Sequence, residues 1–202
     1  MRGMMNKAGW TMGIVACMAA WTARAEGQPS PADMQRGMEI MQKQMALMSP
    51  ELVEKAKALS PEIKQFLVRV ALRHERRSDT LTLVQVMQEI MVEHQAIGVA
   101  IATDNGPLAA DAARRLAFHR LPKGGMLPYL PIEKVTTESL SVLPSMEAAV
   151  EGNATKIAEA AERGDMAAAA HHYGEMTAGC VACHMHFRGQ PGASAYVPRL
   201  RK

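Results

Sequence analysis

Apolar residues recur at intervals of three and four along most of the chain, which is the period of an amphipathic helix. Proline and glycine interrupt this pattern and divide it into segments. Ser49-Pro50 and Ser60-Pro61 each place a capping residue before a proline, and this combination starts new helices. The pattern predicts an all-α protein.

Residues 26–78 are predicted to form a helical hairpin extension. From about residue 32 to 48 the methionines alternate in spacing between four and three, a stripe typical of a flexible packing seam, with a Cu(I) site as the alternative. The segment 61–77 is expected to fold back on this stripe. The charged run that begins at His74 ends the extension. The stripe consists of Met34, Met38, Met41, Met45 and Met48.

Residues 79–189 are predicted to form a second unit of four helices, over about 80–102, 107–119, 137–163 and 166–187. Residues 122–136 contain too many prolines and glycines for regular structure. Pro144 is expected to kink the third helix or delay its start. The first helix carries a stripe that is expected to face the core, and residues 190–202 are predicted to be a flexible tail. The stripe consists of Val84, Met87, Met91, His94, Gly98 and Ile101.

The first 25 residues have the three parts of a secretory signal peptide. A basic start is followed by a short apolar run over residues 10–20 and by the cleavage pattern Ala23-Arg24-Ala25. The run is shorter than the roughly 20 residues that a bilayer core requires, so we expect export to the periplasm and no membrane span in the mature form. Residues 14–17 also resemble a lipobox, and a lipid anchor through Cys17 is the alternative.

Signal cleavage changes the charge of the protein. Residues 1–25 contain Arg2, Lys7 and Arg24 and no acidic residue, so their removal lowers the formal charge from +3 to zero. The mature chain then lacks the basic excess expected of a nucleic-acid-binding protein. It keeps only two cysteines, Cys180 and Cys183.

The candidate chemistry lies in the segment Cys180-Val181-Ala182-Cys183-His184 of the last predicted helix. Sulfurs three residues apart project from nearly one face, can add across the two vinyl groups of one haem, and leave His184 as the proximal iron ligand. Three other interpretations use the same residues. A thioredoxin-like dithiol prefers a helix start; zinc cannot readily be surrounded by these residues and His186; a structural disulfide leaves His184 without a role.

The segment continues as Met185-His186-Phe187-Arg188 near the C-terminus, and in this context it resembles class II cytochromes c, the cytochrome c′ family. The resemblance covers about residues 80–188. It implies an antiparallel four-helix bundle with one covalent haem c per chain between the helices, and it makes a homodimer a reasonable expectation. The extension lies outside the family pattern.

The resemblance also bears on the sixth iron ligand. Electron carriers of this family take a methionine from the first bundle helix, where Met91 is the best positional match and Met87 and His94 are the alternatives. Gas-binding members commonly carry a basic residue within the motif, whereas Val181 and Ala182 are apolar. The remaining histidines are expected to lie too far from the iron (His171 and His172) or to be solvated (His74, His119 and His186).

Together these observations predict a periplasmic monohaem electron-transfer protein that is not an enzyme. Its His/Met-ligated iron would cycle between ferric and ferrous and exchange electrons with redox partner proteins. The alternative is a five-coordinate protein that binds NO or CO. A third hypothesis is that the chain is one module of a larger oxidoreductase and docks to it through residues 26–78.

Overall fold

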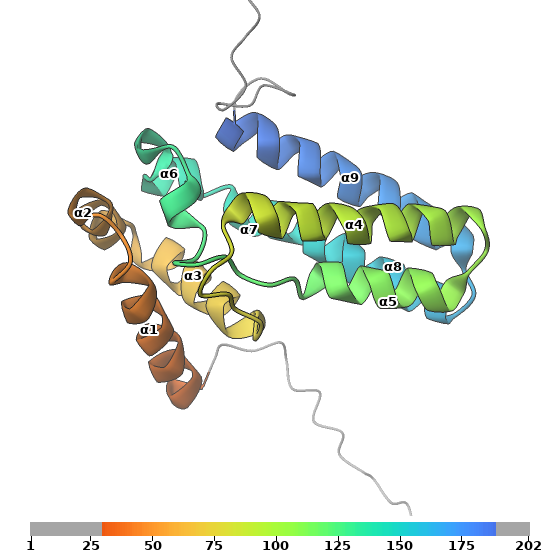
Figure 1. Ribbon diagram of the computed structural model, residues 1–202, viewed down its shortest axis with the longest axis horizontal. Coiled ribbons are helices and arrows are strands. Elements are labelled where there is room, and N and C mark those ends of the chain that lie inside the picture. The colour runs from red at the N-terminus through yellow and green to blue at the C-terminus, as the bar shows by residue number, and fades with distance from the viewer. Residues whose placement is uncertain (1–29, 189–202) are drawn as a thin grey trace, which may run out of the picture.

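The computed structural model describes residues 30–188, and in this range the chain is helical and contains no β-strand (Figure 1). The prediction of an all-α protein is confirmed for these residues. The predicted signal peptide and the C-terminal tail lie outside them. The helices are α1 (Pro31–Met45), α2 (Pro50–Ala58), α3 (Pro61–Arg73), α4 (Leu83–Ala102), α5 (Gly106–Ala117), α6 (Thr137–Leu140), α7 (Leu143–Glu147), α8 (Asn153–Glu162) and α9 (Met166–Arg188).

The extension contains three helices, and the helix starts predicted at Ser49-Pro50 and Ser60-Pro61 are confirmed. Ser30, Ser49 and Ser60 cap α1, α2 and α3, and each side chain accepts a hydrogen bond from a backbone N–H three residues later. The Ser49-Pro50 start therefore makes α2 a separate helix. α1 packs on α3, where Gly37 is buried against Val68.

The third predicted helix of the second unit is divided into shorter pieces. Pro144 lies in the first turn of α7, and a π-helical segment over Ala148–Gly152 separates α7 from α8. Segments with i→i+5 hydrogen bonds are rare and often occur at functional sites. The breaker-rich region before α6 holds only two short 3₁₀ turns, at Leu127–Tyr129 and Ile132–Lys134.

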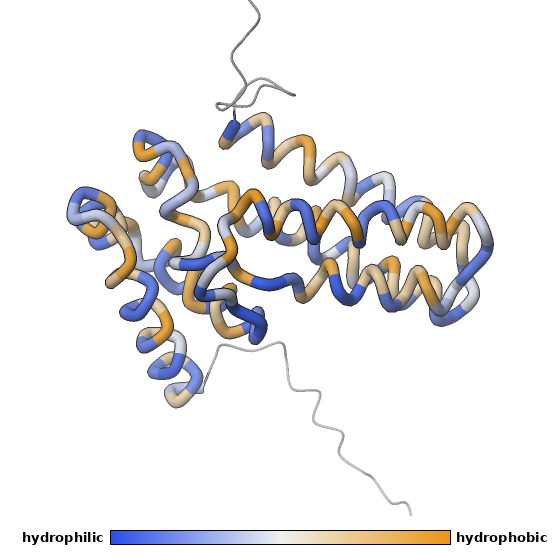
Figure 2. The backbone as a smooth tube through the Cα atoms, viewed as in Figure 1, coloured by the Kyte–Doolittle hydropathy of each residue, from blue (hydrophilic) through white to orange (hydrophobic). Residues whose placement is uncertain are grey.

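Four helices pack side by side around an alanine-rich core (Figures 1 and 2). α5 lies between α4 and α8, and α9 packs on α8 and on part of α4. Ala112, Ala113 and Ala117 of α5 are completely buried, and such small side chains allow close approach of the backbones.

A second apolar cluster joins the extension to the end of α9. Leu52, Ile63 and Phe66 of the extension pack with residues of the breaker-rich region, α6 and α7, and with Phe187 in the last turn of α9. Cys183 packs against the same cluster. The extension is therefore part of the surroundings of the cysteine motif. Within the described residues, no helix has the length and apolar character needed to cross a bilayer.

Candidate functional site

The cysteine motif lies in the interior of α9. Cys180 comes about four turns after the helix start at Met166. Cys180, Cys183 and His184 are half-buried, and both thiols are free. The motif is thus presented on a continuous helix, and its thiols are available for covalent attachment.

Burial favours the neutral form of all three groups of the motif. It raises the pKa of the Cys180 thiol and, together with the neighbouring Cys180, that of the Cys183 thiol. Burial, followed by the charge of Arg188, lowers the pKa of His184. A neutral imidazole is the form that binds a metal. A reactive dithiol would need lowered thiol pKa values, so these shifts argue against a thioredoxin-like pair.

Contacts between α4 and α9 define how the two antiparallel helices are aligned. His94 and Thr177 are joined by a hydrogen bond of 2.9 Å between Nε2 and Oγ1. Tyr173 approaches Gly98, where an added Cβ would lie 2.8 Å from the tyrosine hydroxyl oxygen. A step of four residues forward in α4 thus matches four residues back in α9.

The same alignment places Met87 opposite His184. Met87 lies seven residues before His94, and His184 lies seven residues after Thr177. Seven residues are almost two helical turns, so each of these residues stays on the face that its helix turns toward the other. Met87 is half-buried.

Met91 lies away from the centre of this face. It is level with Cys180, and its side chain is 50% exposed. Val84 is 56% exposed, so the expectation that the whole stripe of α4 faces the core is wrong at these two positions. The helical repeat of 3.6 residues rotates a heptad stripe gradually out of line, so these two positions turn away from the packed side of α4.

Exposed apolar side chains lie on one side of the motif. Val84 and Met91 on α4, and Val181 and Met185 on α9, all stand on the same flank of the helix pair, as follows from the alignment and a rotation of about 100° per residue. All four are roughly half exposed. This apolar flank lies on the other side of His184 from the two thiols, and apolar surface of this kind suits a haem, whose macrocycle is largely apolar.

His94 is committed to other partners. Its Nε2 meets the Thr177 hydroxyl, and its Nδ1 lies 3.1 Å from the hydroxyl oxygen of Tyr173. Burial lowers the pKa of His94. It would have to give up a hydrogen bond to reach an iron, which disfavours it as a ligand.

Zinc binding by the motif finds no support in the geometry. His186 points to α6, where its Nε2 lies 3.0 Å from the carbonyl oxygen of Ser139. Residues 30–188 contain one group of three or more metal-ligating side chains within 4.8 Å, and it does not include the motif. His186 is half-buried, so the expectation that it is solvated is wrong.

The group in question is formed by His74, His119 and Glu151. Both histidines were expected to be solvated, and this expectation is wrong: His74 is completely buried and the His119 side chain is 18% exposed. The three residues come from separate parts of the chain and form no local motif. Only the tertiary structure reveals them.

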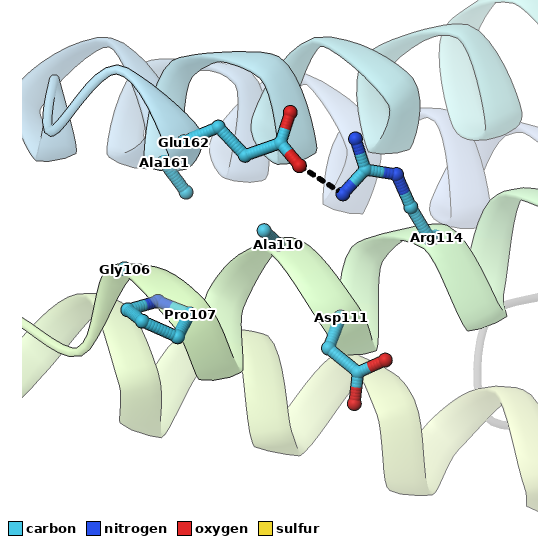
Figure 3. A pocket seen from close by; sticks show the side chains of 7 residues that line it. All are labelled: Gly106, Pro107, Ala110, Asp111, Arg114, Ala161 and Glu162. Carbon is cyan, nitrogen blue, oxygen red and sulfur yellow. Dashed lines mark ion pairs between the residues drawn. The ribbon is translucent and has the colours of Figure 1, made fainter.

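A surface pocket between α5 and α8 is distinct from both places (Figure 3). It is lined by small residues and crossed by an ion pair between Arg114 and Glu162. It lies beside Gly106 at the start of α5, whereas the motif lies at the opposite end of the four helices. The pocket contains neither thiol nor imidazole and carries no functional argument.

Comparisons of the chain with protein-family models, with curated proteins and with solved structures found no match.

Proposed function

We propose that this chain is a monohaem c-type cytochrome that transfers electrons. The proposal rests on the position of the motif. Cys180, Cys183 and His184 lie on one helix, and the alignment set by His94 and Thr177, when continued by two turns, brings His184 level with Met87 of α4. In this proposal α4, α5, α8 with the segments before it, and α9 are the helices of an antiparallel bundle that holds the cofactor.

The chain contributes attachment, ligation and surroundings. Cys180 and Cys183 would hold haem c through two thioether bonds, and His184 would bind its iron. When bound, the haem supplies an iron that cycles between ferric and ferrous. Burial of His184 keeps its imidazole neutral, and the extension packs against Cys183 on the side away from α4.

We further propose Met87 as the sixth ligand, ahead of Met91 and His94. Met87 is level with His184 and on the face directed at α9, whereas Met91 is level with Cys180 and half exposed. A neutral thioether favours ferrous iron and raises the reduction potential. A methionine in this position supports electron transfer over five-coordinate gas binding.

Export belongs to the same proposal. The cleavage pattern at residues 23–25 would deliver the chain to the periplasm, where c-type haem is attached and redox partner proteins would meet it. The lipid anchor at Cys17 remains the alternative form of the same localisation.

The decisive experiment is the intact mass and spectrum of the full chain produced together with haem-attachment machinery. We expect the denatured protein to begin near residue 26, to carry the mass of one haem, and to show a sharp low-spin α band when reduced. The double variant Cys180→Ser/Cys183→Ser should lose all covalent haem. His186→Gln is the matched control and should keep it.

Two outcomes would refute parts of this proposal. A denatured mass equal to that of the bare polypeptide, with both thiols free, would remove the haem. A broad high-spin spectrum with rapid CO binding would keep the haem but replace electron transfer by gas binding.

A further inference from the structure

The group formed by His74, His119 and Glu151 lies where three distant segments meet. His74 follows the last turn of α3, His119 follows α5, and Glu151 lies in the π-helical segment before α8. Backbone pairing holds the first two segments together, with Leu121 donating its N–H to the Arg76 carbonyl at 2.9 Å. The cluster is therefore built on fixed backbone.

The hydrogen bonds of the two rings determine where their protons lie. Nδ1 of His74 lies 2.8 Å from the carbonyl oxygen of His119, and Nδ1 of His119 lies 2.9 Å from the carbonyl oxygen of Arg120. A carbonyl oxygen only accepts, so each Nδ1 must carry a proton. In a neutral ring, Nε2 then presents a lone pair.

Both lone pairs are directed at one carboxylate. Nε2 of His74 lies 3.3 Å from Oε2 of Glu151, and Nε2 of His119 lies 3.4 Å from Oε1. With neutral rings, acceptors face acceptors, and this arrangement needs a cation between them or a proton on each ring. Two imidazolium rings with centroids 4.6 Å apart would repel each other, whereas one shared cation would not.

We propose that His74 Nε2, His119 Nε2 and Glu151 bind one Zn²⁺ ion. Ligand bonds of about 2.0–2.1 Å at tetrahedral angles separate neighbouring ligand atoms by about 3.3 Å, close to both distances from the carboxylate. Metal-binding histidines typically donate their other ring N–H to a backbone carbonyl, as both rings do here. The carboxylate and two imidazoles leave a fourth position for water.

The surroundings allow an ion to enter. The side chains of His119 and Glu151 are 18% and 12% exposed, so the cluster reaches the surface on one side. Nε of Arg73 lies 3.6 Å from Oε2 of Glu151, but Nη1 of the same arginine forms an ion pair of 3.1 Å with Oε1 of Glu147. Glu147 thus offsets the charge of the arginine beside the site.

Zinc in this place would link the extension to the remainder of the protein. His74 belongs to the extension, while His119 directly follows α5 and Glu151 lies in the π-helical segment before α8. The site lies apart from the cysteine motif and does not depend on the proposed haem. Its role would be structural, with the metal clamping α3 onto the segments that precede α8.

Equilibrium dialysis of the full-length, haem-loaded protein against zinc tests the proposal, with zinc and iron per chain measured by elemental analysis. We expect one tightly bound zinc per chain. Loss of supporting residues around a metal typically weakens affinity about 10- to 100-fold, so replacing a ligand, as in His119→Gln or Glu151→Gln, should weaken zinc binding by at least about 100-fold. His171→Gln, which changes an exposed histidine, is the matched control.

Two further measurements make the result unambiguous. Zinc should raise the unfolding temperature of the parent protein but not that of His119→Gln, whose helicity by circular dichroism shows that it folds. The Cys180→Ser/Cys183→Ser variant should still bind zinc, whether or not the haem proposal holds. Absence of stoichiometric zinc in the parent, or equal binding by His119→Gln and Glu151→Gln, would overturn the site.

Discussion

The two faces of α9 are packed in opposite ways. On the face toward the π-helical segment and α8, Met176 is completely buried, and Gly179 is so close to Ala149 that a Cβ would lie 2.9 Å from that residue's Cβ. On the face toward α4, contact is limited to the first half of the helix. Beyond Thr177, apolar side chains remain half exposed.

This difference shows how one helix can serve two purposes. Burial of apolar surface and close packing hold the first face in a single position. On the second face, apolar residues that none of residues 30–188 covers mark a place for a partner or cofactor. By the alignment, His184 lies on this second face, whereas Cys183 packs on the other side against the apolar cluster of the extension. The proposed haem would therefore lie at the border between the packed and the open face.

Of the substitutions that test the open face, Met87→Ala is expected to have the largest effect. In haem-loaded protein, Met87→Ala should convert the low-spin spectrum to a high-spin one, speed CO binding and lower the reduction potential, because the thioether ligand is lost. Met91→Ala, its matched control one turn away, should leave the spectrum unchanged. The reverse result, with Met91→Ala alone losing the low-spin band, would show that the alignment of α4 and α9 does not determine the ligand.

The packed face is tested by two glycines of α9. Gly174→Ala meets no atom within 4 Å and should stabilise the protein by about 1 kcal/mol, the gain in helix propensity. Gly179→Ala meets Ala149 and its backbone, and the overpacking should cost roughly 1–3 kcal/mol against that gain. Urea unfolding of both variants measures the difference. Equal stabilisation would mean that the face is not closely packed.

A smaller effect is expected at His94, on the border between the covered and open halves. Its pKa is lowered by burial, so the folded protein favours the neutral ring. This contribution is present above the ordinary pKa of about 6.5 and is lost as the pH falls below it. The hydroxyl of Tyr173 is a titratable group beside it on α9, 3.1 Å from Nδ1.

Unfolding free energies of the parent and of His94→Gln at neutral and mildly acidic pH provide the measurement. The parent should lose more stability on acidification than the variant, whose amide does not titrate. Parallel loss in both proteins would assign the acid sensitivity to other groups.

Local sequence signals specified most of the helices. The serine caps followed by proline fixed where α1, α2 and α3 start, because a side-chain acceptor and a pre-set backbone angle act within a few residues. The breaks between α6, α7 and α8 were foreseen only at Pro144. The π-helical segment has no such local marker, and its Ala149 packs closely against Gly179 of α9.

The candidate site likewise has one part that local sequence predicts and one part that only the tertiary structure reveals. Five consecutive residues determined the cysteine motif, because one helical turn brings its groups together whatever the remainder of the fold. The sequence ranked Met91 above Met87, since periodicity gives a stripe but not its partner. Only the antiparallel alignment of α4 and α9 placed Met87 opposite His184.

The sequence by itself therefore determined the helical class, the main helix starts and the spacing of the groups in the Cys180–His184 segment on which the proposed chemistry rests, all of which arise from interactions within a few residues. The tertiary structure alone decided which helix faces the motif and that His74 is buried beside His119 and Glu151. Such groupings join residues far apart in sequence, and they exist only when the free energy of packing holds distant segments in contact.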